Sequence, residues 1–226
     1  MNLSIIIPMF NDFDGLRKTL EFVERQEVKC EVIVKDGSDC KYSRDFIEAG
    51  TFRNLHLKYL NQNDDGIYDA INQALDLCRG NHIWIVGCGD LPFVSVLKKL
   101  GIEAGISYAA PVLLSDGFVR QMYHGRLTPS HQGLVYCKEA YQTRRYSTNY
   151  KIISDRIFYD EYIAENKFPI MQIAEPICEF QLNGISSSKS SKKIILNEML
   201  SYVFLMPRMK NILRVISAFR NFVLNF

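Results

Sequence analysis

The sequence predicts an α/β fold in which a mostly parallel sheet is flanked by helices. In its first half, short apolar runs typical of buried strands alternate with segments whose apolar residues have helical spacing. Two of these runs end in acidic turns that contain glycine, over 36–39 and 87–90. Because ligands of open parallel sheets lie beyond the carboxyl ends of the strands, the sequence also predicts a ligand-binding edge.

The first half of the chain has a regular order of elements. Strands are expected where residues are mostly apolar or alternate in polarity, over 3–7, 31–35, 55–60 and 82–86. Helices are expected between them, over 16–23, 43–49 and 67–79, with Asp12 or Asp14 as the cap of the first. This β-α-β order is the signature of parallel strands connected by helices.

The second half is less regular. A short helix is expected over 92–100, followed by strands within 106–120. A polar cluster that contains His131 and Gln132 precedes an apolar strand, a further helix is expected over 150–164, and short strands are expected over 170–173 and 177–180. The sheet is therefore extended by elements that do not follow the β-α-β order.

The composition indicates a soluble globular domain with an appendage. The chain has 226 residues, of which 47% are hydrophobic and 23% are charged. Its six cysteines form no Cys-x-x-Cys pair, so neither zinc nor a disulfide framework is indicated, and reduced thiols in the cytosol are expected. The start of the chain does not resemble a signal peptide, and no run approaches the ~20 apolar residues of a spanning helix.

The C-terminal segment differs in charge from the rest of the chain. Residues 186–226 contain seven Lys or Arg and one Glu, whereas the preceding residues contain twenty basic and 24 acidic residues. We expect a domain over 1–185, a serine-rich, basic linker over 186–193, and a basic amphipathic helix from Arg208 onward. That helix either packs on the domain or in a dimer interface, or binds a membrane surface.

Candidate functional side chains lie next to the predicted elements. Asp90 follows a strand and a Gly-Cys-Gly turn, where it either contributes to a metal-bound phosphate site or caps the next helix. Asp155 lies in the first turn of a helix, where the dipole favours an acid whether or not it acts as a base. His131 and Gln132 either contact a ligand or form structural hydrogen bonds.

Two other nucleotide-binding motifs are not matched. The Gly-Cys-Gly after the fourth strand lacks the third glycine of a dinucleotide fingerprint, and the first strand has no glycines after it. The phosphate-binding loop pattern Gly-x-x-x-x-Gly-Lys-Ser/Thr is absent from the sequence.

Several motifs in this order resemble the family 2 glycosyltransferases with the GT-A fold, especially small bacterial enzymes of exopolysaccharide and O-antigen assembly such as colanic-acid-type transferases. The most specific motif is Asp-Asp-Gly-Ile-Tyr-Asp-Ala-Ile-Asn over 64–72. The supporting motifs cover 4–11, 34–38, 130–132, 154–155 and 178–186. The similarity spans about residues 2–187 and implies a Rossmann-like sheet.

The resemblance also implies roles for individual residues. The donor-binding residues that it implies are Pro8, Asn11, Asp36, Asp64, Gly66 and Asp90. Asp90 takes the Asp-x-Asp position and would hold Mg²⁺ or Mn²⁺, although Gly89 before it leaves a single carboxylate for the metal. Asp155 would be the general base, and the acceptor or leaving-group contacts would be His131, Gln132 and Arg156.

The function implied by the resemblance is inverting sugar transfer. The donor that the resemblance implies is a nucleotide-diphosphate sugar that is UDP-linked, and the acceptor that it implies is a polyprenyl-diphosphate-linked glycan of bacterial surface polysaccharide biosynthesis. The protein would be cytoplasmic and peripheral on the inner face of the plasma membrane. The alternative is a catalytically weak or inactive domain of the same fold that acts as a binding or assembly subunit.

Overall fold

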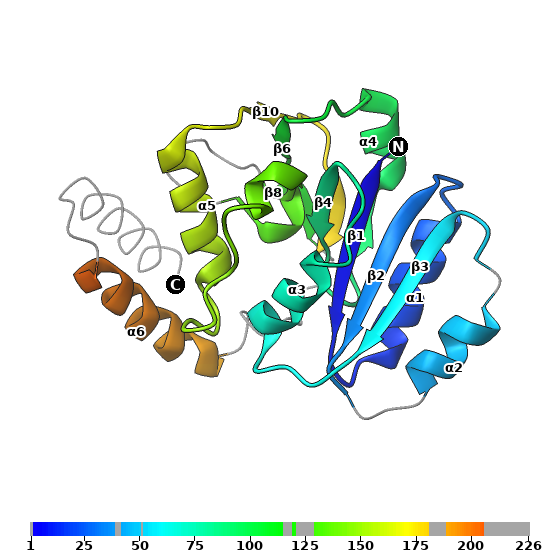
Figure 1. The fold of residues 1–226 in the computed structure, drawn as a ribbon, viewed down its shortest axis with the longest axis horizontal. Helices are drawn as coiled ribbons and strands as arrows, with labels where there is room; N and C mark the ends of the chain where they lie inside the picture. The colour runs from blue at the N-terminus through cyan, green and yellow to red at the C-terminus, as the bar shows by residue number, and fades with distance from the viewer. Residues whose placement is uncertain are drawn as a thin grey trace.

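The central feature of the fold is a mixed sheet (Figure 1). The computed structural model describes residues 2–38, 42–50, 52–114, 119–120, 129–180 and 189–205. Within these residues, seven strands pair in the order β10-β6-β9-β4-β1-β2-β3. The strands are β1 (Leu3–Met9), β2 (Cys30–Asp36), β3 (Leu55–Asn61), β4 (His82–Ile85), β6 (Ser107–Ala109), β9 (Leu134–Cys137) and β10 (Ile170–Gln172).

The predicted parallel half of the sheet is confirmed. β1 pairs in parallel with β2 and β4, and β2 pairs in parallel with β3. β9 runs antiparallel to both β4 and β6, whereas β10 is parallel to β6. The carboxyl ends of β1, β2 and β4 therefore meet at one edge, as the β-α-β pattern requires.

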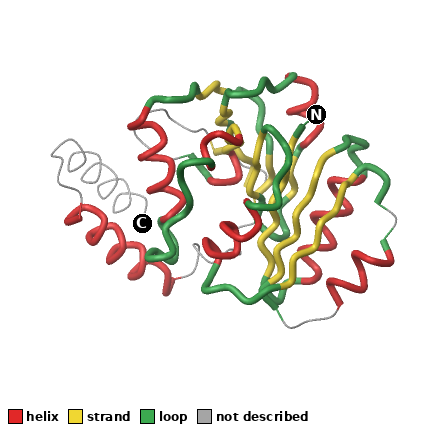
Figure 2. The backbone as a smooth tube through the Cα atoms, viewed as in Figure 1, coloured by secondary structure: helices red, strands yellow, loops and turns green. Residues whose placement is uncertain are grey.

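Helices cover both faces of the sheet (Figure 2). Those whose apolar residues pack on the first face are α1 (Phe13–Glu24), α2 (Tyr42–Ala49) and α4 (Val94–Leu100). The second face is covered by α3 (Ile67–Leu75) and α5 (Ser154–Glu165). Successive residues of a strand point to opposite faces, so Ile5 belongs to the first cluster and Ile6 to the second.

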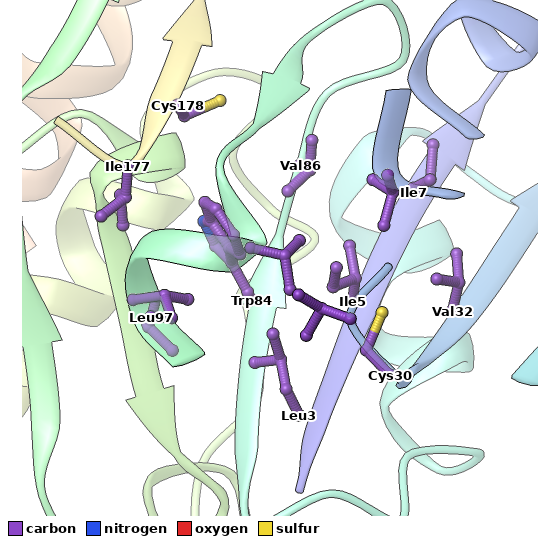
Figure 3. Close-up of a cluster of buried hydrophobic side chains, with 14 of the residues drawn as sticks. Leu3, Ile5, Ile7, Cys30, Val32, Trp84, Val86, Leu97, Ile177 and Cys178 are labelled. Carbon is purple, nitrogen blue, oxygen red and sulfur yellow. The ribbon is translucent and has the colours of Figure 1, made fainter. Parts of the chain in front are cut away.

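The first face has a close-packed apolar interior (Figure 3). Ile5 and Ile7 of β1 point toward this cluster, and Trp84 of β4 and Leu97 of α4 pack in it. All four side chains are fully buried. The burial of Ile5, Ile7 and Trp84 fixes the register of the central strands, because a shift by one residue would turn these three side chains to the other face.

A second, smaller sheet lies beside the carboxyl end of β4. Within the described residues it has the order β5-β11-β7-β8, with β5 (Leu91–Pro92), β7 (Val112–Leu114), β8 (Val119–Arg120) and β11 (Cys178–Phe180). β5 directly follows Asp90 and pairs antiparallel with β11. The helix predicted over 92–100 therefore begins only at Val94, because Pro92 is part of this pairing.

Two further predicted helices are shorter than expected. α3 ends at Leu75, and a turn at Asp76 and Leu77 replaces the last predicted turn. α5 begins at Ser154 rather than Tyr150, which leaves Asp155 in its first turn as predicted. Two short 3-10 helices, η1 (His131–Gly133) and η2 (Lys138–Tyr141), flank β9.

The last described element is α6 (Lys189–Leu205), which packs against the start of α5. Met199 and Tyr202 of α6 are buried together with Ile153 and Ile157. The predicted linker over 186–193 is therefore wrong from Lys189 onward, where the chain is helical and takes part in this packing. The amphipathic helix predicted from Arg208 lies outside the described residues. Among the helices that are described, none has the length and apolar character needed to cross a bilayer.

Candidate active site

A buried lysine of β2 binds the loop that follows β3. The Lys35 side chain is 0% exposed, and its Nζ donates to the Asp64 carboxylate and to the Gln62 carbonyl, both at 2.6 Å. Asp64 also accepts the Gly66 N–H at 3.1 Å, at the start of α3. A buried ammonium is stable only when it is paired, so this contact fixes the position of the Asp64 loop relative to β2.

Asp36 holds the turn at the end of β2. Its carboxylate is fully buried and accepts the Ser38 N–H at 2.8 Å, the Ser38 hydroxyl, and the Tyr59 hydroxyl at 2.7 Å. Gly37 follows, and a Cβ at this position would lie 2.4 Å from Oδ2 of Asp64. The two turns are therefore in close contact, and Gly37 is required for it.

The remaining predicted donor residues lie on the same edge. Pro8 is on β1 in register with Lys35, and Asn11 has a left-handed backbone with a φ of 53°. Gly66 has a φ of 119°, which a residue with a side chain adopts only with strain. Next to Asn11, Asp12 caps α1 by accepting the Gly15 N–H at 3.0 Å, which confirms one of the two predicted caps.

Asp90 lies in a tight loop held by α1. Its side chain is buried, and Oδ2 accepts the Gly87 N–H at 3.1 Å. The Thr19 hydroxyl donates to the Asp90 carbonyl at 2.8 Å and accepts the Gly89 N–H at 3.0 Å. Gly89 has a φ of 92°, so the loop needs glycine there.

The acids at this edge fit a metal ion only together with a ligand. Among the residues that the structure describes, no three His, Cys, Asp or Glu side chains are grouped as a protein-only metal site. The surroundings of Cys88 are negative. Burial raises the pKa of its thiol most, and the charges of the nearby Asp12, Asp90 and Asp36 raise it further. One carboxylate in negative surroundings suits Mg²⁺ or Mn²⁺ that takes its other oxygen ligands from phosphates and water.

The turn over 130–132 lies beside the Asp90 loop. The Trp84 Nε1–H of β4 donates to the Gln132 carbonyl at 2.9 Å, and the Ser130 hydroxyl donates to Gln132 Oε1 at 2.7 Å. Gln132 Nε2 lies 3.7 Å from the place of a Cβ on Gly87, whose N–H binds Asp90. Gln132 therefore has its donor group near the acid at the end of β4.

His131 faces the opposite way, toward a group of aromatic residues. Its Nε2 lies 2.9 Å from the hydroxyl of Tyr146, and the Tyr146 ring stacks on Tyr68 at 5.6 Å between centroids. Burial lowers the pKa of His131, and the negative charge of Asp155 partly offsets this effect. The imidazole is therefore neutral at neutral pH. It lies close enough to Asp155 for the charge of the carboxylate to raise its pKa.

Asp155 is oriented from two sides. Its Oδ1 accepts the Arg156 N–H at 2.7 Å and lies 3.1 Å from the Tyr68 hydroxyl of α3. Burial, and secondarily the Asp155 charge, raise the pKa of Tyr68 well above its ordinary value, so the hydroxyl keeps its proton. Within the described residues no hydrogen bond to Oδ2 is found, which leaves this oxygen for a ligand.

Most of the predicted site residues are brought together, but Arg156 is not. Its guanidinium lies 3.6 Å from Asp160, one turn along α5, and acts electrostatically on Tyr202 of α6. Sequence reasoning missed Lys35, Tyr68 and Tyr146. A lysine inside an apolar strand was a signal for Lys35, and Tyr68 lies within the most specific motif, whereas no local pattern marks Tyr146.

The fold is similar to that of several solved structures, among them a mannosyltransferase. S. aureus TarS 1-349 in complex with UDP-GlcNAc superposes with a TM-score of 0.66 at 16% identity, covering 88% of this chain and 66% of that one. The mannosyltransferase PcManGT from Pyrobaculum calidifontis, in complex with GDP-Man and Mn²⁺, gives 0.65 at 12% identity, covering 96% and 68%. The chain spans 45% of a longer S. aureus TarS structure, which superposes with 0.65 at 16% identity and 93% coverage of this chain. No curated protein matches the chain.

A mostly parallel sheet with helices on both faces, and acids at the carboxyl ends of its strands, define a fold of the GT-A type, which these structures share. The family model described as glycosyl transferase family 2 matches residues 4–100. The match covers less than half of the chain, and within it the sequence is similar to glycosyl transferase family 2. The matched segment contains Pro8, Asn11, Asp36, Asp64, Gly66 and Asp90, whereas the turn over 130–132 and Asp155 lie beyond it.

Proposed function

We propose that the protein transfers a sugar from a nucleoside-diphosphate donor, a UDP-sugar, to a hydroxyl of a glycan acceptor. The observation that carries the proposal is the position of two acids on either side of one turn. Gln132 lies beside the Asp90 loop, and the neighbouring His131 lies near Asp155. One acid is thus placed to handle the charge of a leaving diphosphate and the other to accept a proton.

The donor binds at the edge formed by the ends of β1, β2 and β4. Its binding residues are Pro8, Asn11, Asp36, Asp64, Gly66 and Asp90. Asp36 acts mainly by shaping the edge, because its own carboxylate is already bonded to Ser38 and Tyr59. Similar structures hold UDP, UDP-GlcNAc and GDP-Man, which supports a nucleotide sugar as the class of donor.

Asp90 would hold Mg²⁺ or Mn²⁺ together with the donor diphosphate. Such an ion, when bound, neutralises the charge that develops on the leaving diphosphate. The Mn²⁺ in the PcManGT complex supports this choice of cofactor. Gln132 Nε2 points to the same region and donates a hydrogen bond to a phosphate oxygen.

The chemical step is an inverting displacement. The acceptor oxygen attacks the anomeric carbon of the donor sugar. The bond between the anomeric carbon and the diphosphate oxygen breaks on the opposite face, so the nucleoside diphosphate leaves, and the proton of the acceptor hydroxyl passes to Oδ2 of Asp155. The hydrogen bonds from Arg156 N–H and Tyr68 turn Oδ1 away from the acceptor and leave Oδ2 for this task. The neutral His131 orients the acceptor hydroxyl without competing for its proton.

The acceptor and location are further parts of the proposal. A polyprenyl-diphosphate-linked glycan would be presented at the inner face of the plasma membrane, where the basic 186–226 segment binds anionic lipid. Arg156 would reach an acceptor phosphate only after leaving Asp160. One observation favours a second candidate function, a weakly active subunit of the same fold. Asp90 offers a metal a single carboxylate, and among the described residues no three His, Cys, Asp or Glu side chains are grouped so that they could hold a metal ion.

The test is donor use by the purified protein. A set of UDP- and GDP-sugars with and without Mn²⁺ is screened by thermal shift, because a ligand that binds only the native state raises the apparent stability by RT ln(1+[L]/Kd). The best donor is then assayed for metal-dependent hydrolysis and for transfer to a lipid-linked saccharide. Metal-dependent turnover is expected. Binding without any turnover would instead establish the inactive subunit.

A further inference from the structure

Helix α6 reaches the turn that leads into Asp155 through one side chain, Glu198. The Glu198 Oε1 accepts the Lys151 N–H at 2.6 Å, and Oε2 accepts the Ile152 N–H at 3.0 Å and the Ile153 N–H at 3.2 Å. Three consecutive backbone donors therefore point to one carboxylate. A charged acceptor makes stronger hydrogen bonds than a neutral one, so this contact fixes the turn just before α5.

The same turn binds the tyrosine that orients Asp155. The Tyr68 hydroxyl lies within hydrogen-bonding distance of the Ile152 carbonyl as well as of Oδ1 of Asp155. The Ile152 carbonyl and the Ile153 N–H belong to one peptide group, and Glu198 binds the N–H of that group. A negative charge at the N–H end polarises the peptide and strengthens its carbonyl as an acceptor.

The contacts thus form one chain from α6 to the candidate base: Glu198, the peptide between Ile152 and Ile153, Tyr68, and Asp155. Tyr68 has a single proton, and the polarised carbonyl competes for it. Oδ1 of Asp155 is a strong acceptor while the side chain is a carboxylate and a weaker one once a proton is bound at Oδ2, so the Tyr68 hydroxyl then donates to the Ile152 carbonyl instead. The form with a proton at Oδ2 is the one that Asp155 reaches after it removes the acceptor proton.

We propose that Glu198 is a positioning residue for the transfer reaction, which α6 contributes from outside the segment matched by the family model. The inference rests on the proposed function, since it gives Glu198 a role through Asp155. Its sequence signal is present: Glu198 is the one acid among seven basic residues in 186–226. Met199 and Tyr202 provide the packing that holds the helix in place, and Glu198 transmits its position to the site.

The test compares Glu198→Ala and Glu198→Gln in the full chain. Glu198→Ala removes all three hydrogen bonds, and kcat for transfer should fall about 10- to 100-fold, the size expected when a reacting group is displaced by about 1 Å. The donor Kd should stay unchanged, because the donor edge lies at β1, β2 and β4. Glu198→Gln keeps one carbonyl oxygen and should recover part of the rate. Asn197→Ala, an exposed neighbour on α6, is the matched control and should behave as wild type.

A double-mutant cycle with Asp155→Asn separates positioning from general stability. All rates are measured below the unfolding temperature of each variant. If Glu198 acts through Asp155, Glu198→Ala should cause no further loss once Asp155 is Asn. An additive loss, a parallel loss of donor binding, or wild-type activity of Glu198→Ala overturns the inference while the proposed function stands. Wild-type activity of Asp155→Asn would instead remove the proposed base, and with it this role of Glu198.

Discussion

Lys35 and Asp64 form a salt bridge of 2.6 Å in which the lysine side chain is completely buried, and this pair joins the ends of β2 and β3 at the proposed donor edge. The same two strands carry a second pair of the same kind, in which Lys58 Nζ donates to Glu31 at 2.5 Å and to the Leu77 carbonyl at 2.7 Å. Glu31 is near the amino end of β2, away from the site. The two pairs therefore offer a matched comparison between stability and function.

We expect Lys35→Met to lower both stability and donor affinity. The substitution leaves Asp64 without its partner in a largely buried place, and we expect a cost of about 2 kcal/mol, below the full range for buried pairs because water reaches part of Asp64. Urea denaturation measures the stability loss, and calorimetric titration with the donor measures binding. Lys58→Met should lower stability to a similar extent and leave donor binding intact. If both variants bind the donor equally well, the Asp64 loop is not part of the donor site.

A second prediction concerns Gly87. Its backbone is not left-handed, so alanine is tolerated locally, but the added Cβ would lie 2.6 Å from Oδ2 of Asp90. The Asp90 carboxylate must then move, and we expect Gly87→Ala to weaken metal-dependent donor binding. Asp90→Asn should abolish the metal dependence, because an amide does not replace a carboxylate against a divalent cation. Asp14→Asn, at an exposed acid of α1, is the control for charge alone.

The measurement is donor Kd with and without Mn²⁺ for the three variants. The ratio of the two values should fall toward one in Asp90→Asn and should be intermediate in Gly87→Ala. An unchanged ratio in Asp90→Asn would mean that this acid caps the loop through Gly87 and holds no metal.

The partly buried His131 gives a prediction for stability against pH. In the folded protein, burial lowers the pKa of His131 below its ordinary value of 6.5, which applies to the unfolded chain. Between the folded and the unfolded pKa, the unfolded chain therefore binds more protons than the folded one. Stability should therefore be fully present above pH 6.5 and decrease as the pH falls through the folded pKa, by up to about 1.4 kcal/mol per pH unit. His82 contributes in the same direction, because burial lowers its pKa too.

Chemical denaturation at pH 7.0, 6.0 and 5.5 checks this prediction. His131→Gln should reduce the slope and keep the part that comes from His82. A wild-type slope in His131→Gln would show that the imidazole is not buried in its neutral form.

The C-terminal segment divides into two parts that should respond differently to truncation. Removing 189–226 exposes the surface that Met199 and Tyr202 cover. We expect the free energy of unfolding to fall by about 3–6 kcal/mol, because the burial of two side chains is lost. Removing only 206–226 should leave the fold stable and reduce sedimentation with anionic vesicles, because four of the seven basic residues are lost. Unchanged vesicle binding of the shorter truncation would contradict membrane attachment by this part.

The sequence was sufficient for the parallel half of the fold, because the strands there are mostly apolar or alternate in polarity and short helices connect them. It was less informative where pairing is set by distant residues. Nothing near Pro92 indicates that β11 will pair with it, and nothing near Lys189 indicates that Ile153 and Ile157 will bury the helix that begins there. The linker over 186–193 was predicted from local composition, and tertiary packing overrides composition in this segment.

The candidate site shows the same division. Acids at strand ends could be found from strand positions, but the residues that orient them could not. Tyr146 reaches His131 and stacks on Tyr68 from a segment without regular structure, and Glu198 acts from the last described helix. Contacts of this kind join residues far apart in the sequence, so no spacing rule marks them.

The last prediction is that Asp155→Asn suppresses transfer and spares donor binding. The proposed donor-binding residues lie within the first hundred residues, whereas Asp155 belongs to α5 and is held by Tyr68 and by its own helix. Asparagine keeps the shape of the side chain, and its carbonyl oxygen still accepts the Arg156 N–H, but it has no basicity. A positioned base contributes about 10²- to 10⁴-fold, so kcat should fall by this factor at unchanged donor Kd.

The matched control is Asp160→Asn, one helical turn further along α5, where the acid pairs with Arg156 and should not affect the chemical step. Single-turnover transfer measures the chemical step, and calorimetry measures the donor Kd. Tyr68→Phe adds a finer comparison, because it keeps the ring that stacks on Tyr146 and removes only the hydroxyl near Oδ1. Its loss should be smaller than that of Asp155→Asn, since the carboxylate remains and only its orientation is relaxed. A loss of less than tenfold in Asp155→Asn, or an equal loss of donor binding, would remove Asp155 from the role of base.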